Sequence, residues 1–573
     1  MSQEAVGSDI VQTGGVASQI SLQGASKAAG EQARSRVFLA ILIIGLVYAT
    51  IIGRLAYLGA IELDGPSSNR YSNLATSATR PDIVDRNGNL LATDIITSSL
   101  FAEPRRIVDV DEAVELLTTV LPELDVRAIH RKLASKAGFV WLKRELTPKI
   151  QSEILALGIP GIGFRSETKR FYPKGETLSH LVGYVDIDNV GIAGLEKYID
   201  GQGLNELRNA GFAQGDDMKP VKLSIDTRVQ HFIRDELAKA MDRYDAIGAG
   251  AVVLNIHTGE IVGMASLPDF NSNSPADAQK KDRLNRMTAG TYEMGSTFKT
   301  FTTAMALDSG LVNLKSKFDA TKPLRIAGFT INDFHAKRRV LSVPEVFIYS
   351  SNIGTAKMAE VVGIKGHREF LHRIGLLEKM QLELPEVARP KEPKVWKKIN
   401  SVTISYGHGA QTTPLQTAVA AAALMNGGML IPPTLFPRSH KQAEQLAKRV
   451  VQKKTSDSMR YLMRLNVEKG SGRRAEVPGF RVGGKTGTAE KVVNGRYSSK
   501  VRFNSFLAVF PIDNPKYVVL SIIDEPKPEA GKKSATAGLN AAPIVRNIIR
   551  RAAPVLGIQP KFGNAGQPLY VRN

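Results

Sequence analysis

Two side chains three positions apart, Ser296 and Lys299, have a spacing that can support nucleophilic chemistry. They lie at the start of an apolar helical run, so they share one face of the predicted helix. Gly295 marks the entry to that helix, where the helix dipole favours a developing negative charge. Because serine is a weak nucleophile, a nearby amine can activate it by taking its proton. The pair alone is weak evidence, since a chain of this length holds on the order of two such pairs by chance. Ser166 and Lys169 form another, and a helix cap alone would explain Ser296.

Two further motifs carry groups that complement this pair. Ser350 and Asn352 place a hydroxyl and an amide two positions apart, which is enough to relay a proton and to hold a peptide bond. Residues 484–488, Gly-Lys-Thr-Gly-Thr, lie in a predicted strand, where glycine lets a ligand approach the backbone. Lys485 and the threonine hydroxyls can bind a carboxylate. Each motif alone fits a polar loop or a β-turn, but the ordered set S-x-x-K, S-x-N and K-T-G-T is far more specific.

Length and composition limit the class of protein that carries these motifs. The chain has 573 residues, which is too long for one ordinary domain. Hydrophobic (43%) and charged (23%) fractions exclude wholesale disorder. The absence of cysteine excludes disulfides, thiolate zinc sites and cysteine nucleophiles. The net charge of +21 suggests an anionic partner. Without a nucleic-acid-binding signature, we favour anionic lipid or polymer over nucleic acid.

An apolar segment near the N-terminus is typical of a membrane anchor. Residues 37–61 contain a single charge, Arg54, and are long enough to cross a bilayer of about 30 Å. Arginines precede the segment and acidic residues follow it, which places residues 1–36 in the cytoplasm. The composition of these residues predicts a disordered tail. A cleaved signal peptide is the alternative, but 36 residues before the apolar run are too many for one. The sequence therefore predicts one transmembrane helix, with the rest of the chain exported.

The exported part divides into two predicted domains of an α+β fold. Residues 62–220 form an elongated scaffold, or pedestal, with a hairpin at Asn87 and Gly88 and helical patterns between residues 110 and 157. Residues 221–557 contain two strands, a long helical middle, three strands and a last helix over about residues 541–556. This order predicts one five-stranded antiparallel sheet flanked by helices. A helix after residue 226 is capped by Asp226 or Thr227, and residues 558–573 are a C-terminal tail.

On these motifs, residues 35–557 resemble a class B penicillin-binding protein, and more narrowly the division-specific (septal) peptidoglycan D,D-transpeptidases of Gram-negative bacteria. Other segments resemble family signatures as well: residues 170–173, 191–196, 405–410 and 413–416. Residues 80–88 are similar to the family's R-G-x-I-x-D-R-x-G, with Pro81 in place of the usual glycine. Pro81 lies in the pedestal, so the departure has little bearing on catalysis.

The resemblance implies a role for each motif residue in the acylation step. Ser296 attacks the penultimate D-alanine carbonyl of a stem peptide, and Lys299 is the general base. Burial and the nearby Lys485 are expected to lower the pKa of Lys299 so that its amine is neutral. Ser350 passes the proton to the leaving amine. Asn352 holds Lys299 and the peptide carbonyl side.

The resemblance also implies how the substrate's terminus is bound. Lys485, Thr486 and Thr488 bind its terminal carboxylate, with Gly487 between the two threonines. The backbone N–H groups of Ser296 and Thr488 form the oxyanion hole. No metal ion and no cofactor are expected.

The implied function is cross-linking of septal cell wall at the bacterial inner membrane, with the catalytic domain in the periplasm at the division site and β-lactams acylating the same serine. A polytopic glycan polymerase and other division proteins are the expected partners, through the anchor and pedestal. Alternatives are an elongation-type transpeptidase or a D,D-carboxypeptidase and, from another class, a membrane-anchored division scaffold or β-lactam sensor. A class A β-lactamase is disfavoured because no E-x-x-L-N motif follows Ser350. His180 and His408 are interpreted as turn or packing residues, since neither has a partner at ligand spacing.

Overall fold

The computed structural model describes residues 38–39, 41–54, 80–203, 219–493, 495–532 and 534–562. The predicted cytoplasmic tail, the ends of the predicted anchor and the last eleven residues lie outside these ranges. Two compact units are distinguished, Met1–Thr76 and Ser77–Asn573. In the first, residues 41–54 are helical. Across the described ranges, no helix is both long and apolar enough to cross a membrane, so the predicted anchor stays a prediction.

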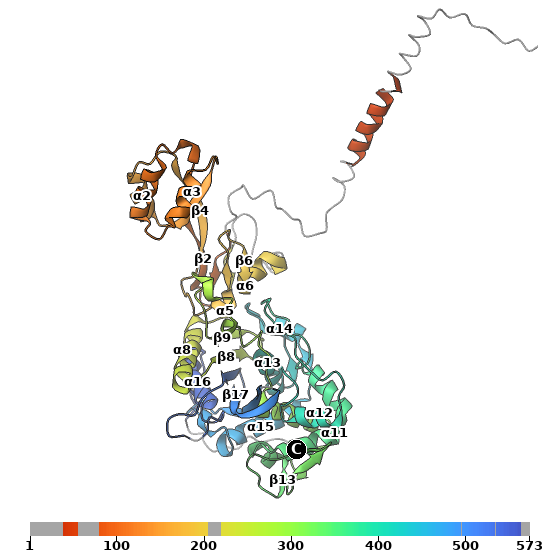
Figure 1. Ribbon diagram of the computed structural model, residues 1–573. Coiled ribbons are helices and arrows are strands. Elements are labelled where there is room, and N and C mark those ends of the chain that lie inside the picture. The colour runs from red at the N-terminus through yellow and green to blue at the C-terminus, as the bar shows by residue number, and fades with distance from the viewer. Residues whose placement is uncertain are drawn as a thin grey trace, which may run out of the picture. The chain divides into compact units, whose positions relative to one another are not determined.

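The pedestal is built around the long strand β2, labelled in Figure 1. β2 pairs with β1 through the turn at Asn87 and Gly88, where Gly88 has a φ of 87°, and it pairs with β3 and β4 further along. The predicted hairpin is therefore present. The pedestal elements are β1 (Ile83–Val84), β2 (Leu90–Ala102), α2 (Val110–Val120), α3 (Val126–Leu133), β3 (Val140–Leu146), α4 (Pro148–Ala156), β4 (Ile162–Phe171), α5 (Ser179–Val182), β5 (Tyr184–Val185), β6 (Gly191–Ala193) and α6 (Gly194–Tyr198).

One correction concerns residues 110–157, for which the sequence predicted helices. α2, α3 and α4 are present, but β3 lies between α3 and α4. Leu142 and Leu146 of β3 are buried with the apolar faces of the three helices in one core. Four pairs of residues align β3 with β2, a long-range interaction that a local periodicity does not reveal.

The second part of the unit contains the predicted five-stranded antiparallel sheet, in the order β16-β17-β18-β8-β9. Its elements are β7 (Val221–Lys222), α8 (Thr227–Tyr244), β8 (Gly248–Asn255), β9 (Ile261–Leu267), α9 (Lys299–Asp308), α10 (Val343–Ile348), α11 (Asn352–Arg373), α12 (Lys398–Ser405), α13 (Pro414–Met425), α14 (His440–Leu446), α15 (Lys453–Lys469), β16 (Gly483–Val493), β17 (Arg496–Phe510), β18 (Tyr517–Asp524) and α16 (Ala541–Val555). β11 (Leu324–Ile326) and β12 (Phe329–Ile331) form a small hairpin. Two further two-stranded sheets pair β10 (Lys317–Asp319) with β13 (Val340–Ser342) and β14 (Met429–Leu430) with β15 (Lys448–Arg449).

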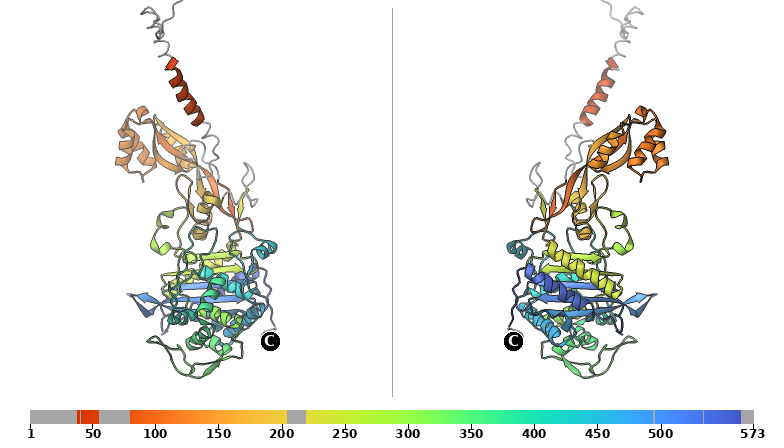
Figure 2. Two further views of the ribbon diagram at one scale, coloured as in Figure 1. Left: turned by 90° about the vertical axis from the view of Figure 1, so that its right-hand side faces the viewer. Right: turned by 90° about the vertical axis from the view of Figure 1, so that its left-hand side faces the viewer.

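The sheet is covered on both faces, which explains its almost wholly apolar strands. In β8, Ala251 and Val253 belong to one core with α8 and α16, while Val252 and Leu254 belong to the other core with α9 and α13. This alternation follows the two-residue period of a strand. Figure 2 shows α8 and α16 over one face and the helices of the middle of the chain over the other. Asp226, one of the two predicted caps, caps α8.

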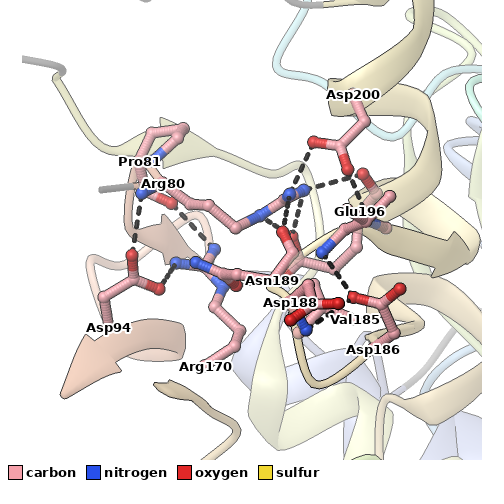
Figure 3. Close-up of polar contacts among 12 residues, drawn as sticks. Arg80, Pro81, Asp94, Arg170, Val185, Asp186, Asp188, Asn189, Glu196 and Asp200 are labelled. Carbon is pink, nitrogen blue, oxygen red and sulfur yellow. Dashed lines mark hydrogen bonds and ion pairs between the residues drawn. The ribbon is translucent and has the colours of Figure 1, made fainter. Parts of the chain in front are cut away.

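A buried ion-pair network holds the lower pedestal together (Figure 3). Arg170 donates to Glu196 (2.7 Å) and to Asp94 (3.0 Å), and Arg80 donates to the second oxygen of Glu196 (2.9 Å). The side chains of Arg170 and Glu196 are fully buried. Arg170 also donates to the carbonyl of Pro81 (2.8 Å). Residue 81 thus contributes only its carbonyl to the network, which proline retains, and this explains why Pro81 is accommodated here.

We expect Glu196→Gln to destabilise the pedestal by about 3–5 kcal/mol, because it leaves two buried guanidinium groups without their shared carboxylate. Denaturant unfolding of the full chain checks this, with Trp396→Phe as background so that Trp141 on β3 is the only tryptophan. Glu153→Gln is the matched control, since Glu153 faces Lys149 in an exposed pair. An unfolding midpoint of Glu196→Gln equal to that of the control would contradict the prediction.

Candidate active site

Ser296 lies in a short 3-10 turn, η5 (Gly295–Phe298), that leads directly into α9. The sequence predicted Ser296 at the start of an α-helix. In the structure, the first residues of that predicted helix form this 3-10 turn. Gly295 has a φ of 53°, and a Cβ added there would lie 2.6 Å from the carbonyl oxygen of Thr488. A Cβ on Gly407 would collide with the backbone of Gly295. The turn is therefore held between β16 and the loop after α12, at distances that only glycine permits.

Two lysines meet at the hydroxyl of Ser350. Lys299 Nζ lies 3.1 Å from Ser350 Oγ and also donates to the Ser350 carbonyl. Lys485 Nζ, from β16, lies 3.0 Å from the same Oγ and 3.1 Å from the carbonyl oxygen of Thr486. Ser350 connects α10 to α11 with a φ of 54°, an uncommon conformation for a residue with a side chain. Residues from three distant segments are thus brought to one oxygen.

Burial of both amines lowers their pKa values. Burial lowers the pKa of Lys299 well below its ordinary value, the charge of Lys485 lowers it further, and Asp333 opposes the shift. This is the direction expected from the sequence. Burial also lowers the pKa of Lys485 to about 7. A neutral amine at residue 299 has two N–H groups and one lone pair, and both of its hydrogen bonds go to Ser350. The lone pair is left to accept a proton.

The edge of β16 faces the Ser296 turn. The carbonyl of Gly484 accepts from Asn466 (2.7 Å), and the carbonyl of Thr488 faces Gly295. N–H and C=O of one residue point to the same side of an antiparallel strand, so the N–H of Thr488 points toward the turn as well. A Cβ on Gly487 would lie 2.5 Å from the carbonyl of Met294, so a side chain at residue 487 would push the turn away.

The threonine hydroxyls of β16 have protein partners. Thr486 Oγ1 lies 2.6 Å from Ser471 Oγ, and Thr488 Oγ1 accepts from the backbone N–H of Ala537 (3.2 Å). A hydroxyl that accepts in this way still has its own hydrogen to donate to a carboxylate.

Asn352 makes a different contact from the one expected. Its side-chain amide donates to the carbonyl of Asn332 (2.8 Å), whereas the hydrogen bonds of Lys299 go to Ser350. The neighbouring Asp333, which the sequence analysis did not single out, accepts from Ser351 Oγ (2.7 Å) and from the N–H of Ile353 (3.0 Å). Asp333 therefore fixes the start of α11, and only the three-dimensional contact identifies it.

Comparisons with known proteins identify the family of the chain. The model of the penicillin-binding protein transpeptidase domain matches residues 249–550, and the model of the penicillin-binding protein dimerisation domain matches residues 75–208. The chain belongs to the class B penicillin-binding proteins. A probable peptidoglycan D,D-transpeptidase FtsI of Caulobacter vibrioides is 39% identical over 542 residues, which are 93% of this chain and 90% of the relative.

Other members are more distant. A probable peptidoglycan D,D-transpeptidase PenA of Neisseria gonorrhoeae is 33% identical, covering 92% of this chain and 93% of the relative. The peptidoglycan D,D-transpeptidase FtsI of Escherichia coli K12 is 29% identical, covering 90% and 91%. The crystal structure of penicillin-binding protein 2X from Streptococcus thermophilus has the same fold, with a TM-score of 0.66 at 22% identity over 84% of this chain and 80% of that chain.

The two shifted lysines predict a pH dependence for acylation by benzylpenicillin. The second-order rate constant should rise with pH as Lys299 becomes neutral, well below the usual range for lysine. It should fall above about pH 7, where Lys485 loses the proton that attracts a carboxylate. Stopped-flow acylation kinetics of the full chain measure both limbs. Lys485→Arg, which keeps its charge, should move the alkaline limb to higher pH. An alkaline limb at the same pH in this variant would assign it to another group.

Proposed function

We propose that the protein is a peptidoglycan D,D-transpeptidase that cross-links stem peptides of the septal wall through an acyl-enzyme on Ser296. The observation that carries this proposal is the pair of buried amines, Lys299 and Lys485, on the hydroxyl of Ser350. A serine one helical turn before such an amine has the base that it needs for attack. The 39% identical Caulobacter relative, whose name states the same activity, supports the proposal.

In the first step, Ser296 Oγ attacks the carbonyl of the penultimate D-alanine and gives its proton to the neutral amine of Lys299. Ser350, hydrogen-bonded to that amine, passes a proton to the nitrogen of the leaving D-alanine. The peptide C–N bond breaks and an ester on Ser296 forms. General acid–base catalysis of this kind contributes about 10²–10⁴-fold to a rate.

The negative charge that develops on the carbonyl oxygen is stabilised by the backbone N–H groups of Ser296 and Thr488. Each such donor contributes about 3–4 kcal/mol. Lys485 and the hydroxyls of Thr486 and Thr488 bind the terminal carboxylate, and Asn352 contacts the peptide. The edge of β16, with Gly487 close to the turn, brings these groups alongside the nucleophile.

In the second step, an amine of a neighbouring stem peptide attacks the ester, so that an amide cross-link forms and Ser296 is regenerated. A β-lactam acylates the same serine, but its ring-opened product remains attached and blocks the site. Attack by water in place of the amine would make the protein a D,D-carboxypeptidase.

The proposal includes the location of the protein. Residues 37–61 anchor the chain in the inner membrane, with residues 1–36 in the cytoplasm, residues 62–220 as the pedestal and residues 221–557 as the periplasmic catalytic domain. Between residues 41 and 54, large apolar side chains are exposed around the helix, as on a helix that contacts lipid. The anchor and pedestal are the parts available to a polytopic glycan polymerase at the division site.

Intact-mass spectrometry of the full chain in detergent, with and without benzylpenicillin, tests the proposal. We expect one stable adduct that peptide mapping assigns to Ser296 and that Ser296→Ala abolishes. Ser166→Ala is the matched control, because Ser166 and Lys169 have the same spacing but lie on β4 of the pedestal, and it should retain the adduct. An unmodified wild type with intact drug would refute the proposal, and rapid hydrolysis of the drug without an adduct would indicate a β-lactamase.

A further inference from the structure

A cluster of titratable side chains lies beside the nucleophile and has no part in the acylation chemistry described above. Glu293, three residues before Ser296, accepts three hydrogen bonds: from His408 Nδ1 (3.1 Å), from the backbone N–H of Gly409 (2.8 Å) and from the hydroxyl of Tyr497 (3.0 Å). The rings of His408 and Tyr497 are in edge contact, with centroids 5.4 Å apart. His408 was interpreted from the sequence as a turn or packing residue because it lacked a partner. Glu293 is a partner that only the fold supplies.

The loop that carries His408 runs alongside the Ser296 turn. Tyr292 and Thr412 exchange two backbone hydrogen bonds, of 2.9 and 3.0 Å, and Gly407 lies against Gly295 with no room for a side chain. The residue before His408 thus touches the residue before Ser296. His408 keeps about a quarter of its side chain exposed, whereas Lys299 and Lys485 are buried. His408 is therefore partly accessible from solvent.

The contact with Glu293 sets the tautomer of His408. A carboxylate accepts hydrogen bonds, so Nδ1 carries the proton and Nε2 carries the lone pair. Among the described residues, no protein group is hydrogen-bonded to Nε2. Although burial raises the pKa of Glu293, the hydrogen bonds from His408, Gly409 and Tyr497 hold it below its ordinary value. Glu293 therefore remains an anion that can stabilise an imidazolium.

The second step of the proposed reaction needs such a base. An aliphatic amine is protonated at neutral pH and cannot attack an ester until it loses a proton. The Lys299 and Lys485 pair is a poor site for this ammonium, because any charge on those amines repels it. The Glu293 and His408 pair has the opposite sign, and its proton acceptor is on a side chain that is partly exposed.

We propose that His408 is the catalytic base that receives the acceptor ammonium and takes its proton during cross-linking, and that Glu293 is the residue that positions it. The inference rests on the proposed transpeptidase function and extends it to the second substrate.

The proton and bond changes balance as follows. His408 Nε2 takes one proton from the ammonium, and the free amine attacks the ester carbonyl on Ser296. The new C–N bond forms and the C–O bond to Ser296 breaks. The second amine proton returns to Ser296 Oγ through Lys299, and the imidazolium releases its proton to solvent. Tyr406, Tyr497 and Glu490 are the other titratable groups around this pair.

The test separates aminolysis from acylation in the full-length protein. A thioester analogue of a D-alanyl-D-alanine terminus serves as acyl donor, and D-alanine serves as the ammonium acceptor. We expect His408→Phe, which keeps an aromatic ring, to lower the ratio of aminolysis to hydrolysis by about 100-fold, while benzylpenicillin still acylates Ser296 at the wild-type rate. Glu293→Gln should lower the ratio less, because the hydrogen bond remains without the charge.

A second acceptor distinguishes a base from a structural residue. Hydroxylamine is uncharged at neutral pH and needs no base, so His408→Phe should use it as well as the wild type does. Loss of aminolysis with both acceptors would overturn the proposal in favour of a structural role, and an unchanged ratio with D-alanine would refute it outright. His231→Gln, an exposed histidine on α8, is the control. Failure of the wild type to form a penicillin adduct would refute the transpeptidase function itself, an outcome distinct from either of these.

Discussion

The burial of two amines around one serine hydroxyl is the constraint on which the site depends. A buried ammonium is costly unless it is paired, and two of them a few ångströms apart repel each other. Hydrogen bonds to Ser350 and to the Thr486 carbonyl partly compensate Lys299 and Lys485 for this cost. Burial also lowers the pKa of both amines, so that each loses its proton more readily than an exposed lysine. The strain is useful, because an amine that has lost its proton is a base and one that retains it attracts a carboxylate. The Ser296 turn, the start of α11 and the edge of β16 hold the two amines in these positions.

The pedestal also buries cationic side chains, but there their charge is kept and paired with a carboxylate. Arg170 and Arg80 are buried too, but they share the carboxylate of Glu196, so their charges are compensated and fixed. A guanidinium cannot escape its charge by losing a proton, whereas a lysine can. Arginine therefore suits the part of the chain that must stay rigid, and lysine suits the part that must exchange protons. The charged cluster of the pedestal and the amine cluster of the active site are both buried, so they differ mainly in residue type.

The sequence predicted those features that depend on local pattern. The five strands of the large sheet (β8, β9, β16, β17 and β18) were visible because their apolar runs are bounded by turns, and the three motifs were visible because each has a fixed spacing. β3 was missed because a seven-residue strand between helices is defined by its pairing with β2. Asp333, Glu293 and His408 were missed because their partners lie 18 to 204 residues away, so no spacing links them. The expected contact of Asn352 with Lys299 stays a prediction, and the acceptor that Asn352 has in this structure, Asn332, was not foreseen.

The glycines around the nucleophile explain why one turn can serve two substrates. Gly295, Gly407 and Gly487 let β16 and the loop after α12 approach the turn within backbone contact. β16 carries Lys485 and the N–H groups that suit an anionic peptide terminus and a developing oxyanion. The loop after α12 carries His408, whose imidazole and the carboxylate of Glu293 together suit a cation. The donor ends in a carboxylate and the acceptor begins as an ammonium. Because the two differ in charge, electrostatics can direct the donor to Lys485 and the acceptor to the Glu293 and His408 pair. Water carries no charge, so neither group attracts it to Ser296 in the way that each attracts its charged substrate.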